Sequence, residues 1–376
     1  MTHNKFFLRV TRLLIAPVMA SLLPLMAEAS TKVIGAVYTM SNAAEGNSVL
    51  MFNRLINGRL WPAGEFATGG LGSGTGLGNQ GGVILDTGNR WLFAVNAGSS
   101  DISVFAVGEA GLTLVDVEPS GGLQPISLTY SGNVLYVLNS GGAVGGIDNI
   151  AGFRLSEEGD LTPIAGATQL LSGDNVGPAQ ISFNGDGDVL VVTEKATNLL
   201  VTFTVDESGV AGTANLFPSA GVTPFGFAFA ERDQILVSEA AGGAEGASTL
   251  SSYQLSKDGS LVLISDAVAS GQSAACWAVV SNDGRFVYTT NTLTNNVSGY
   301  RVAFDGSVML LNDSGIAATT GAGPLDMVAS SDGRHLYTLD SGAAALSGFR
   351  LTPYGSLVRI KVNVSVPATA NGLAIR

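Results

Sequence analysis

The chain of 376 residues carries 30 Asp and Glu against 18 Lys and Arg, and its net charge of −12 argues against binding to the phosphates of a nucleic acid. A single cysteine excludes an intrachain disulfide framework and Cys-rich metal sites, and two histidines leave little room for His-based catalysis. With 46% apolar and 13% charged residues, the chain is able to bury a sizeable core.

The first 29 residues have the pattern of a secretory signal peptide. A basic start is followed by the apolar stretch 13–26 and then by Ala27-Glu28-Ala29, the small-x-small pattern of a signal-peptidase site. A membrane-spanning helix needs about 20 apolar residues, so an uncleaved anchor is the less favoured alternative. We therefore expect cleavage before Ser30 and export to the periplasm or the extracellular space. The mature chain, residues 30–376, is expected to have no membrane span.

Beyond residue 30 the sequence repeats with a period of about 50 residues, a spacing that indicates a repeat architecture. An aromatic residue is followed six positions later by a glycine seven times, and the glycines lie 53, 48, 50, 50, 47 and 49 residues apart. The pairs are Phe52/Gly58, Phe105/Gly111, Phe153/Gly159, Phe203/Gly209, Tyr253/Gly259, Tyr300/Gly306 and Phe349/Gly355. Each pair predicts two strands joined by a tight turn that needs a positive φ at the glycine.

A second motif ends the strand that precedes each hairpin. Its seven forms are YTMS (38–41), FAVN (93–96), YVLN (136–139), VVTE (191–194), LVSE (236–239), YTTN (288–291) and YTLD (337–340). Four strands in each of seven repeats predict an all-β fold, a single seven-bladed β-propeller over residues 30–376. The first repeat lacks an innermost strand before Val33, and the terminal segment 372–376 is expected to supply it and close the ring.

The YVTN-like strand ends and the turns SNDGR (281–285) and SSDGR (330–334) resemble those of the seven-bladed lactonase-type propellers. This group includes 6-phosphogluconolactonase and the 3-carboxymuconate lactonising enzyme, so the resemblance implies lactonase or cycloisomerase activity. Where active members carry Pro-His, Pro-Arg-His and Asn-Glu, this sequence has Pro125-Ile126, Pro178-Ala179-Gln180 and Thr193-Glu194. The chain is therefore similar to a divergent, exported branch that lacks the basic catalytic residues.

Polar residues recur where inner strands begin and where their partner strands end. Because the two strands are antiparallel, these positions should form one ring at a mouth of the channel. We expect Glu194 and Glu239 to be the catalytic residues, each able to act as a general base on water, and to be partly accessible to solvent. The expected binding residues are Ser127, Gln180, Lys195, Phe225, Trp277, Asn291, Asp326 and Asp340. A scaffold role stays open for each polar member, because Asn and Asp after a strand are ordinary turn formers.

The side chains of this ring limit the classes of ligand that we expect it to bind. Lys195 is its only evident cation, so an anionic lactone would lack the basic groups that usually hold it. We expect hydrolysis of a neutral lactone or sugar lactone. The alternative is a non-catalytic propeller that binds a small molecule, a glycan or a protein partner on the same face. No cofactor and no metal site are expected, although binding of Ca²⁺ or Mg²⁺ by side-chain oxygens stays open.

Several other motifs are interpreted as structural. Gly76-x-Gly78-x-x-Gly81 matches the dinucleotide fingerprint, but a strand rather than a helix follows it, so no phosphate site is expected. His335 is predicted to lie in the core or between blades, and Cys276 to be a small buried thiol. Trp277 could belong to the core or offer a stacking surface for a flat ligand.

Overall fold

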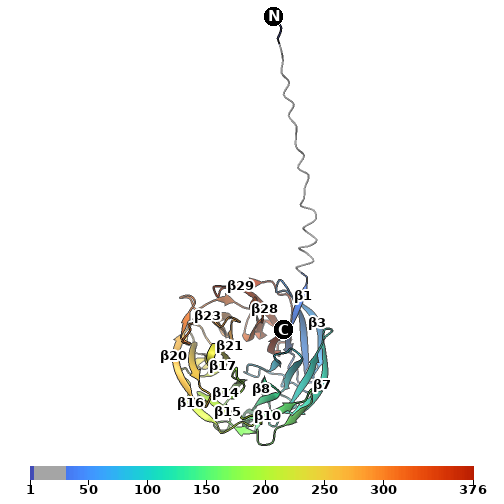
Figure 1. Ribbon diagram of the computed structural model, residues 1–376, viewed down its shortest axis with the longest axis vertical. Coiled ribbons are helices and arrows are strands. Elements are labelled where there is room, and N and C mark those ends of the chain that lie inside the picture. The colour runs from blue at the N-terminus through green and yellow to red at the C-terminus, as the bar shows by residue number, and fades with distance from the viewer. Residues whose placement is uncertain (4–30) are drawn as a thin grey trace.

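The computed structural model describes residues 1–3 and 31–376. The strands between Val33 and Ile375 form seven antiparallel sheets around a central channel (Figure 1). This confirms the predicted seven-bladed β-propeller. The apolar stretch and the cleavage site of the predicted signal peptide fall outside the described residues. No helix in the part of the chain that is described is long and apolar enough to cross a membrane.

Each blade has four strand positions, which follow one another from the channel outward. Blade 1 consists of β30 (Asn371–Ile375), β1 (Val33–Met40), β2 (Ser48–Leu55) and β3 (Leu60–Ala67), and blade 2 of β4 (Val83–Leu85), β5 (Trp91–Asn96), β6 (Asp101–Val107) and β7 (Leu112–Pro119). Blade 3 consists of β8 (Pro125–Ser131), β9 (Val134–Ser140), β10 (Asp148–Leu155) and an outer strand split into β11 (Leu161–Pro163) and β12 (Gln169–Leu170). Blade 4 consists of β13 (Pro178–Phe183), β14 (Val189–Glu194), β15 (Leu199–Thr204) and β16 (Asn215–Pro218).

The remaining three blades follow the same order. Blade 5 consists of β17 (Pro224–Phe229), β18 (Gln234–Glu239), β19 (Thr249–Leu255) and β20 (Leu261–Ala269). Blade 6 consists of β21 (Ala275–Val280), β22 (Phe286–Asn291), β23 (Asn296–Val302) and a split outer strand, β24 (Val308–Leu310) and β25 (Ala318–Thr319). Blade 7 consists of β26 (Pro324–Ala329), β27 (His335–Asp340), β28 (Ala345–Leu351) and β29 (Leu357–Ile360). The short 3-10 helices are η1 (Gly141–Val144), η2 (Glu231–Asp233), η3 (Ala241–Gly243) and η4 (Ser341–Ala343).

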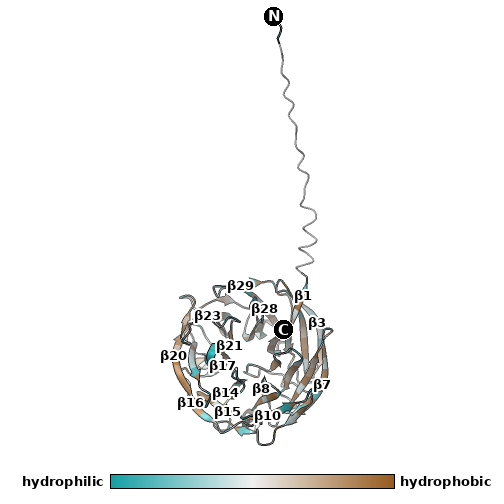
Figure 2. Ribbon diagram, viewed as in Figure 1, coloured by the Kyte–Doolittle hydropathy of each residue, from teal (hydrophilic) through white to brown (hydrophobic). Residues whose placement is uncertain are grey.

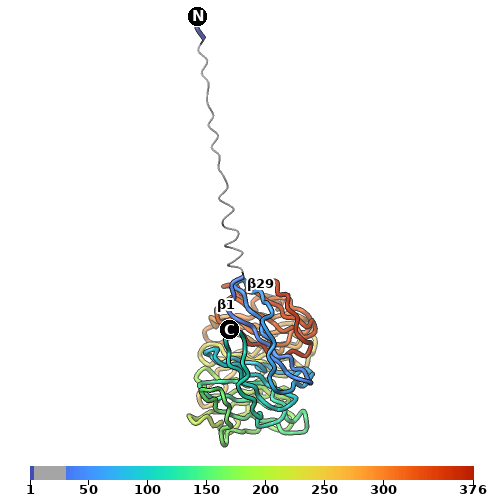
Figure 3. The backbone as a smooth tube through the Cα atoms, turned by 90° about the vertical axis from the view of Figure 1, so that its right-hand side faces the viewer, coloured from blue at the N-terminus to red at the C-terminus, as the bar shows by residue number. Residues whose placement is uncertain are grey.

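The two ends of the propeller sequence close the ring within blade 1, as predicted. Strand β30 pairs antiparallel with β1, and Ala36 and Arg376 exchange backbone hydrogen bonds of 3.1 and 2.9 Å. Figure 3 shows the C-terminus beside the blue strand β1. The closing strand begins at Asn371, one residue before the predicted segment. Because the closing strand takes the inner position of blade 1, the inner edge of β1 is paired.

The two repeated motifs meet across the blade interfaces. The hydroxyl of Tyr136 in blade 3 donates to the carbonyl of Gly209 in blade 4, at 2.8 Å. The same bond joins Tyr288 to Gly355 at 2.8 Å and Tyr337 to Gly58 at 2.7 Å. All seven repeat glycines have the predicted positive φ, from 79° to 141°. In these three blades the tyrosine of the strand-end motif therefore binds the hairpin turn of the next blade.

The second strand of each blade forms the packed interior. All six residues are buried in β5, β14, β18, β22 and β27. Figure 2 shows mainly hydrophobic colour along the strands of the blades. We call the face where inner strands begin the upper face, and the face where they end the lower face. This direction matters because the candidate site residues all lie toward the upper face.

Candidate functional site

Glu194, the residue carried over from the family motif, holds a loop of its own blade. Its carboxylate accepts hydrogen bonds from the backbone N–H of Ser172 at 3.0 Å, from the Ser172 hydroxyl and from Thr197 at 2.6 Å. Ser172 belongs to the connection that leads from blade 3 into the inner strand of blade 4. The side chain has 0% exposure, so the expectation that it is partly accessible is wrong.

Glu239 and Asp340 occupy the same position in blades 5 and 7, and their carboxylates also accept hydrogen bonds from a connecting loop. Glu239 accepts from the N–H of Gly221 at 3.1 Å and from Thr249 at 2.5 Å. Asp340 accepts from the N–H of Gly321 at 2.8 Å, and its surroundings, like those of Glu239, raise the pKa of the carboxyl through burial. Glu239 has 0% exposure, so the expectation that it is partly accessible to solvent is also wrong. The connecting loop passes over the end of the second strand, and its N–H groups need an acceptor there.

Asn291 fills this position in blade 6. Its amide donates to Asn296 and to Ser298, both at 2.8 Å, and the side chain is fully buried. The residues predicted from the partner-strand ends thus turn into their own blades and not toward the channel. The structure does not bring them together with the inner-strand residues of the predicted ring.

The inner-strand members of the ring do gather around the channel. Ser127 and Gln180 each bond to the inner strand of the next blade. The hydroxyl of Ser127 accepts the N–H of Ile181 at 3.1 Å. The amide of Gln180 accepts the N–H of Phe227 at 2.7 Å and donates to the carbonyl of the same residue at 3.0 Å. These side chains tie blades together along the channel wall.

The glycine-rich connection between blades 1 and 2 enters the channel at this level. Residues 77–82, which we call the channel segment, bond to inner strands from most of the ring. The amide of Asn79 donates to the carbonyl of Ile126 in blade 3 and accepts from Asn371 in blade 1 at 2.9 Å. Its backbone carbonyl accepts the indole N–H of Trp277 in blade 6. The indole N–H is thus already bonded to the channel segment, and Trp277 is only 2% exposed, so its ring does not offer a stacking surface to a ligand in this structure.

Gln80 bonds to blade 6 at the level where blade 5 has no side chain to do so. Its side chain accepts the N–H of Ala278 at 3.2 Å and donates to the carbonyl of Ala278 at 2.9 Å, the same pair of bonds that Gln180 makes one blade earlier. The position equivalent to Gln180 in blade 5 is Gly226, which has no side chain to offer. A Cβ on Gly226 would overlap Oε1 of Gln80. The channel segment therefore replaces a missing wall residue and closes the upper channel.

Lys195 binds the channel segment through its ammonium group. Its ammonium donates to the carbonyls of Gly78 and Pro178 and lies 4.7 Å from the ring centre of Phe225. Burial lowers the pKa of Lys195 to about 8. Phe225 in turn packs on Trp277 with ring centres 5.0 Å apart, and burial raises the pKa of the neighbouring Cys276 thiol to about 11. Lys195, Phe225 and Trp277 are thus brought together as predicted, but in a filled interior.

Below Gln80 the channel opens into a cavity of about 310 Å³, which we call the channel chamber. Inner strands of blades 1 to 4, 6 and 7 contribute to its wall. The first four residues of β17 and β21 are buried and the last two are half-buried. This gradient indicates that solvent enters the channel from the lower face.

Asp326 lines the chamber and is the side chain there that is best suited to proton transfer. Its carboxylate accepts the backbone N–H of Met327 at 2.7 Å and of Leu373 at 2.9 Å, which ties blade 7 to blade 1. Burial raises the pKa of Asp326 to about 7, against these two bonds, which lower it. A carboxyl group with such a pKa takes up or releases a proton near neutral pH.

Two features of this site do not follow from the sequence patterns. The glycine-rich pattern assigns no role to the channel segment, and no motif predicts the chamber beneath it. The available signals are the length of the connection, residues 68–82, and the absence of a side chain at Gly226. Within the described residues there is no group of three or more His, Cys, Asp or Glu that could hold a metal ion.

Comparisons with known proteins agree with this architecture. The sequence model of the family described as "Lactonase, 7-bladed beta-propeller" matches residues 244–371, from blade 5 to the start of the closing strand. Together with the seven blades, this match confirms the resemblance to lactonase-type propellers. A comparison with curated protein sequences gave no match.

Solved structures resemble the whole propeller. A provisionally assigned 6-phosphogluconolactonase from Bacteroides fragilis has 19% identity and a TM-score of 0.72, covering 91% of this chain and 98% of that one. A protein from Lactobacillus plantarum has 14% identity and a TM-score of 0.72, covering 91% and 100%. The periplasmic gluconolactonase of Pseudomonas aeruginosa has 16% identity and a TM-score of 0.69, covering 91% and 98%. At these identities the likeness establishes the fold alone.

Proposed function

We propose that this lactonase-type propeller hydrolyses a small neutral lactone in the channel chamber, with Asp326 as the general base. The observation that carries the proposal is a buried carboxyl whose pKa is about 7, on the wall of a cavity of about 310 Å³. A base with a pKa near the working pH combines a large ionised fraction with effective proton transfer. The proposal moves the catalytic role from Glu194 and Glu239 to Asp326, because Asp326 lines the channel chamber and the two glutamates do not.

The lining of the chamber favours an uncharged substrate. Besides Asp326, its polar side chains are Gln80, Gln180, Thr129, Ser182 and Tyr130, and none of the described lining residues is Lys or Arg. An anionic lactone would meet the Asp326 carboxylate without a cation to hold it. The volume lies at the small end of the range of ~300–1,000 Å³ for ligand pockets, which suits one sugar-sized ring.

The hydrolysis requires Asp326 to take a proton from water as the water oxygen bonds to the lactone carbonyl carbon. The developing oxyanion needs a hydrogen-bond donor. Gln80 has one amide N–H beyond the bond to Ala278, and the hydroxyl of Thr129 already accepts the N–H of Phe183 and keeps its own proton to donate. Collapse then breaks the ring C–O bond, and the ring oxygen takes the proton from Asp326.

A second candidate is a non-catalytic binder that uses the same chamber. It is favoured by the closed upper channel, where the basic residues of the family motif are replaced by Ile126, Ala179 and Gln180. For this candidate, a neutral lactone or sugar would raise the melting temperature without being converted.

We also propose that the protein is exported, because residues 1–29 have the pattern of a signal peptide. N-terminal sequencing of the secreted protein should give Ser30, and retention of Met1 would contradict the proposal.

The experiment for the catalytic proposal is a pH-stat screen of neutral and phosphorylated aldonolactones with the mature protein, corrected for spontaneous hydrolysis. Turnover of neutral lactones that falls at least about 10²-fold in Asp326→Asn would support it. Glu194→Gln serves as the comparison, since its expected effect is on stability. Turnover unchanged in Asp326→Asn would overturn the proposal.

A further inference from the structure

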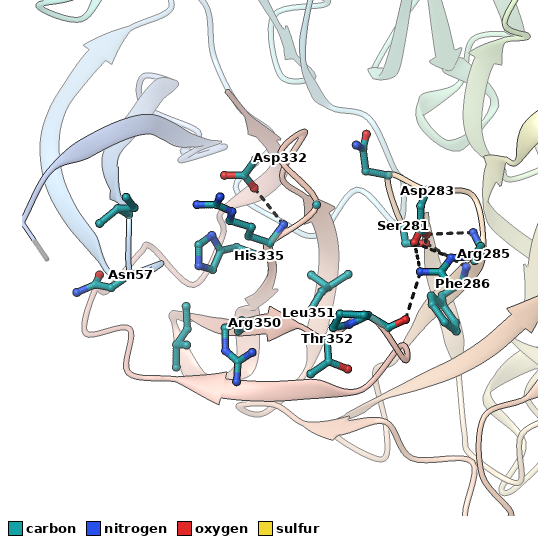
Figure 4. A pocket seen from close by; sticks show the side chains of 16 residues that line it. Asn57, Ser281, Asp283, Arg285, Phe286, Asp332, His335, Arg350, Leu351 and Thr352 are labelled. Carbon is teal, nitrogen blue, oxygen red and sulfur yellow. Dashed lines mark hydrogen bonds and ion pairs between the residues drawn. The ribbon is translucent and has the colours of Figure 1, made fainter. Parts of the chain in front are cut away.

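A larger cavity of about 720 Å³ lies on the lower face, where blades 6, 7 and 1 meet (Figure 4). We call it the lower-face cavity. Its walls come from the turns 281–286 and 332–335, the segment 350–353 of blade 7, and Ile56, Asn57 and Ile360. It shares no lining residue with the channel chamber, so it does not belong to the site proposed above.

The two carboxylates of this cavity are already engaged. Asp283 forms an ion pair with Arg285, with a shortest N–O distance of 2.6 Å. Asp332 forms one with the buried Arg54, at 2.9 Å. Burial acts to raise the pKa of Asp332, but bonds from Ser330 and Arg54 hold it at about 2. Both negative charges are therefore neutralised within the wall.

Two arginines of the cavity are left without a partner. Among the described residues, the guanidinium groups of Arg334 and Arg350 form no hydrogen bond, ion pair or stacking contact. Four cations (Arg54, Arg285, Arg334, Arg350) against two carboxylates (Asp283, Asp332) leave a local charge of +2, in a chain of net charge −12. An isolated excess of positive charge in a concave site attracts anions.

His335 connects these charges. It is the registered partner of Arg350 across β27 and β28, so the two side chains share one face of blade 7. Nδ1 of His335 lies 3.4 Å from Nη1 of Arg54, and because arginine only donates, this nitrogen accepts. Burial lowers the pKa of His335, although Asp332 acts to raise it. The imidazole is thus neutral. His335 and Arg350 both line the cavity, as Figure 4 shows.

The rest of the wall is apolar. Phe286, Leu351, Pro353, Ile56 and Ile360 line the cavity beside the charged groups. A free phosphate or carboxylate would use only the arginines, whereas a ligand with an apolar body would also remove this surface from water. Guanidinium groups match the geometry of carboxylate and phosphate oxygens. We propose that the lower-face cavity binds an organic anion, a carboxylate or phosphate monoester attached to an aryl or alkyl group.

The test uses isothermal titration of the mature protein with phenyl phosphate and with benzoate, which separate the two anion types. Inorganic phosphate and benzyl alcohol each carry one half of the proposed ligand and are expected to bind at least tenfold more weakly. Arg350→Gln and Arg334→Gln should each weaken binding of the preferred anion by about tenfold or more, as loss of a charge-assisted hydrogen bond implies.

Lys257→Gln is the matched control. Lys257 lies in the exposed turn between β19 and β20, also on the lower face, and the substitution removes one positive charge outside the cavity. It should leave binding within twofold of wild type. Unchanged melting temperatures would show that the arginine variants are folded, since both side chains are exposed. Equal binding by benzyl alcohol, wild-type affinity in both arginine variants, or no saturable binding of either anion would overturn the proposal.

Discussion

The side-chain amide of Gln80 fills the space that a side chain on Gly226 would need, and it makes the bonds to blade 6 that Gly226 cannot make. Gln180 makes the same two bonds from blade 4 to blade 5 within the regular wall. The channel segment is therefore part of the ring of ties between blades. Gln80 also donates its backbone N–H to the carbonyl of Ala179 in blade 4 at 3.1 Å, so the segment in the upper channel bonds to blades 4 and 6 on either side of blade 5.

Replacing Gln80 by alanine should destabilise the propeller. The variant leaves the N–H and the carbonyl of Ala278 without their partner, and unpaired buried groups cost about 1–3 kcal/mol each. Chemical denaturation should therefore give a free energy of unfolding lower by about 2 kcal/mol or more. Gln169→Ala, which removes a single bond to the carbonyl of Ala211, is the control and should cost less. Equal losses would mean that the channel segment does not support the ring.

A methyl group at Gly226 should displace Gln80. Gly226→Ala introduces a Cβ into the volume of Oε1 of Gln80, beside the backbone of Cys276 and Trp277. Overpacking of this kind costs about 1–3 kcal/mol. Gly185→Ala is the matched control, because a Cβ there meets nothing within 4 Å. If both variants melt at the wild-type temperature, the proposed fit between Gly226 and Gln80 is wrong.

The ring depends on its closing strand. Deletion of residues 371–376 removes β30 and exposes the backbone of β1, together with the buried Leu373 and Ala374 packing. We expect the truncated protein to lose several kcal/mol of stability or to fail to fold. Thermal melting followed by circular dichroism measures this. A truncated chain that melts within a degree or two of wild type would rule out closure through β30.

Asp326 should make stability depend on pH. Its pKa of about 7 in the folded protein lies above the ordinary value of 3.8, because burial disfavours the charged form. Between pH 4 and 7 the folded state holds a proton that the unfolded state has released, so this contribution to stability is lost as pH rises through 7.

The pH-dependent contribution of Asp326 to stability can be measured by comparing wild type with Asp326→Asn, because the Asn side chain does not titrate. The stability of wild type relative to this variant should fall by about 2–3 kcal/mol between pH 5 and pH 8. The Asn variant is also destabilised at every pH, because its amide NH2 faces the N–H of Leu373 or Met327 where a carboxylate oxygen accepted it. The test therefore compares how the stability of each protein changes with pH, and not the stability at one pH. A difference between the two proteins that stays constant over this range would contradict a raised pKa.

The fold could be predicted almost completely from the sequence, and the site only in part. The fold follows from local signals: each repeat contains a glycine turn such as Gly209 and a strand-end motif, and in blades 3, 6 and 7 the tyrosine of that motif binds such a turn in the next blade. The rim position of Glu194 also follows from strand direction. The direction of its side chain does not, because it depends on the path of the loop at Ser172.

The closure of the upper channel could not have been predicted from local patterns. Gln80 and Ala278 lie 198 residues apart, and nothing near either residue in the sequence indicates the other. Asp326 is among the predicted binding residues because it lies at the beginning of an inner strand. Its raised pKa depends on how the neighbouring blades exclude water, which is a property of the closed ring.

The most direct test of the catalytic proposal is the pH dependence of kcat/KM for a neutral aldonolactone, measured on wild type and Asp326→Asn. If ionised Asp326 is the general base, kcat/KM of wild type rises with pH through an apparent pKa near 7 and levels above it. The Asn variant should lose at least about 10²-fold in rate and the inflection with it. A wild-type profile without this inflection, or an Asn variant that keeps both rate and profile, would contradict the assignment of Asp326.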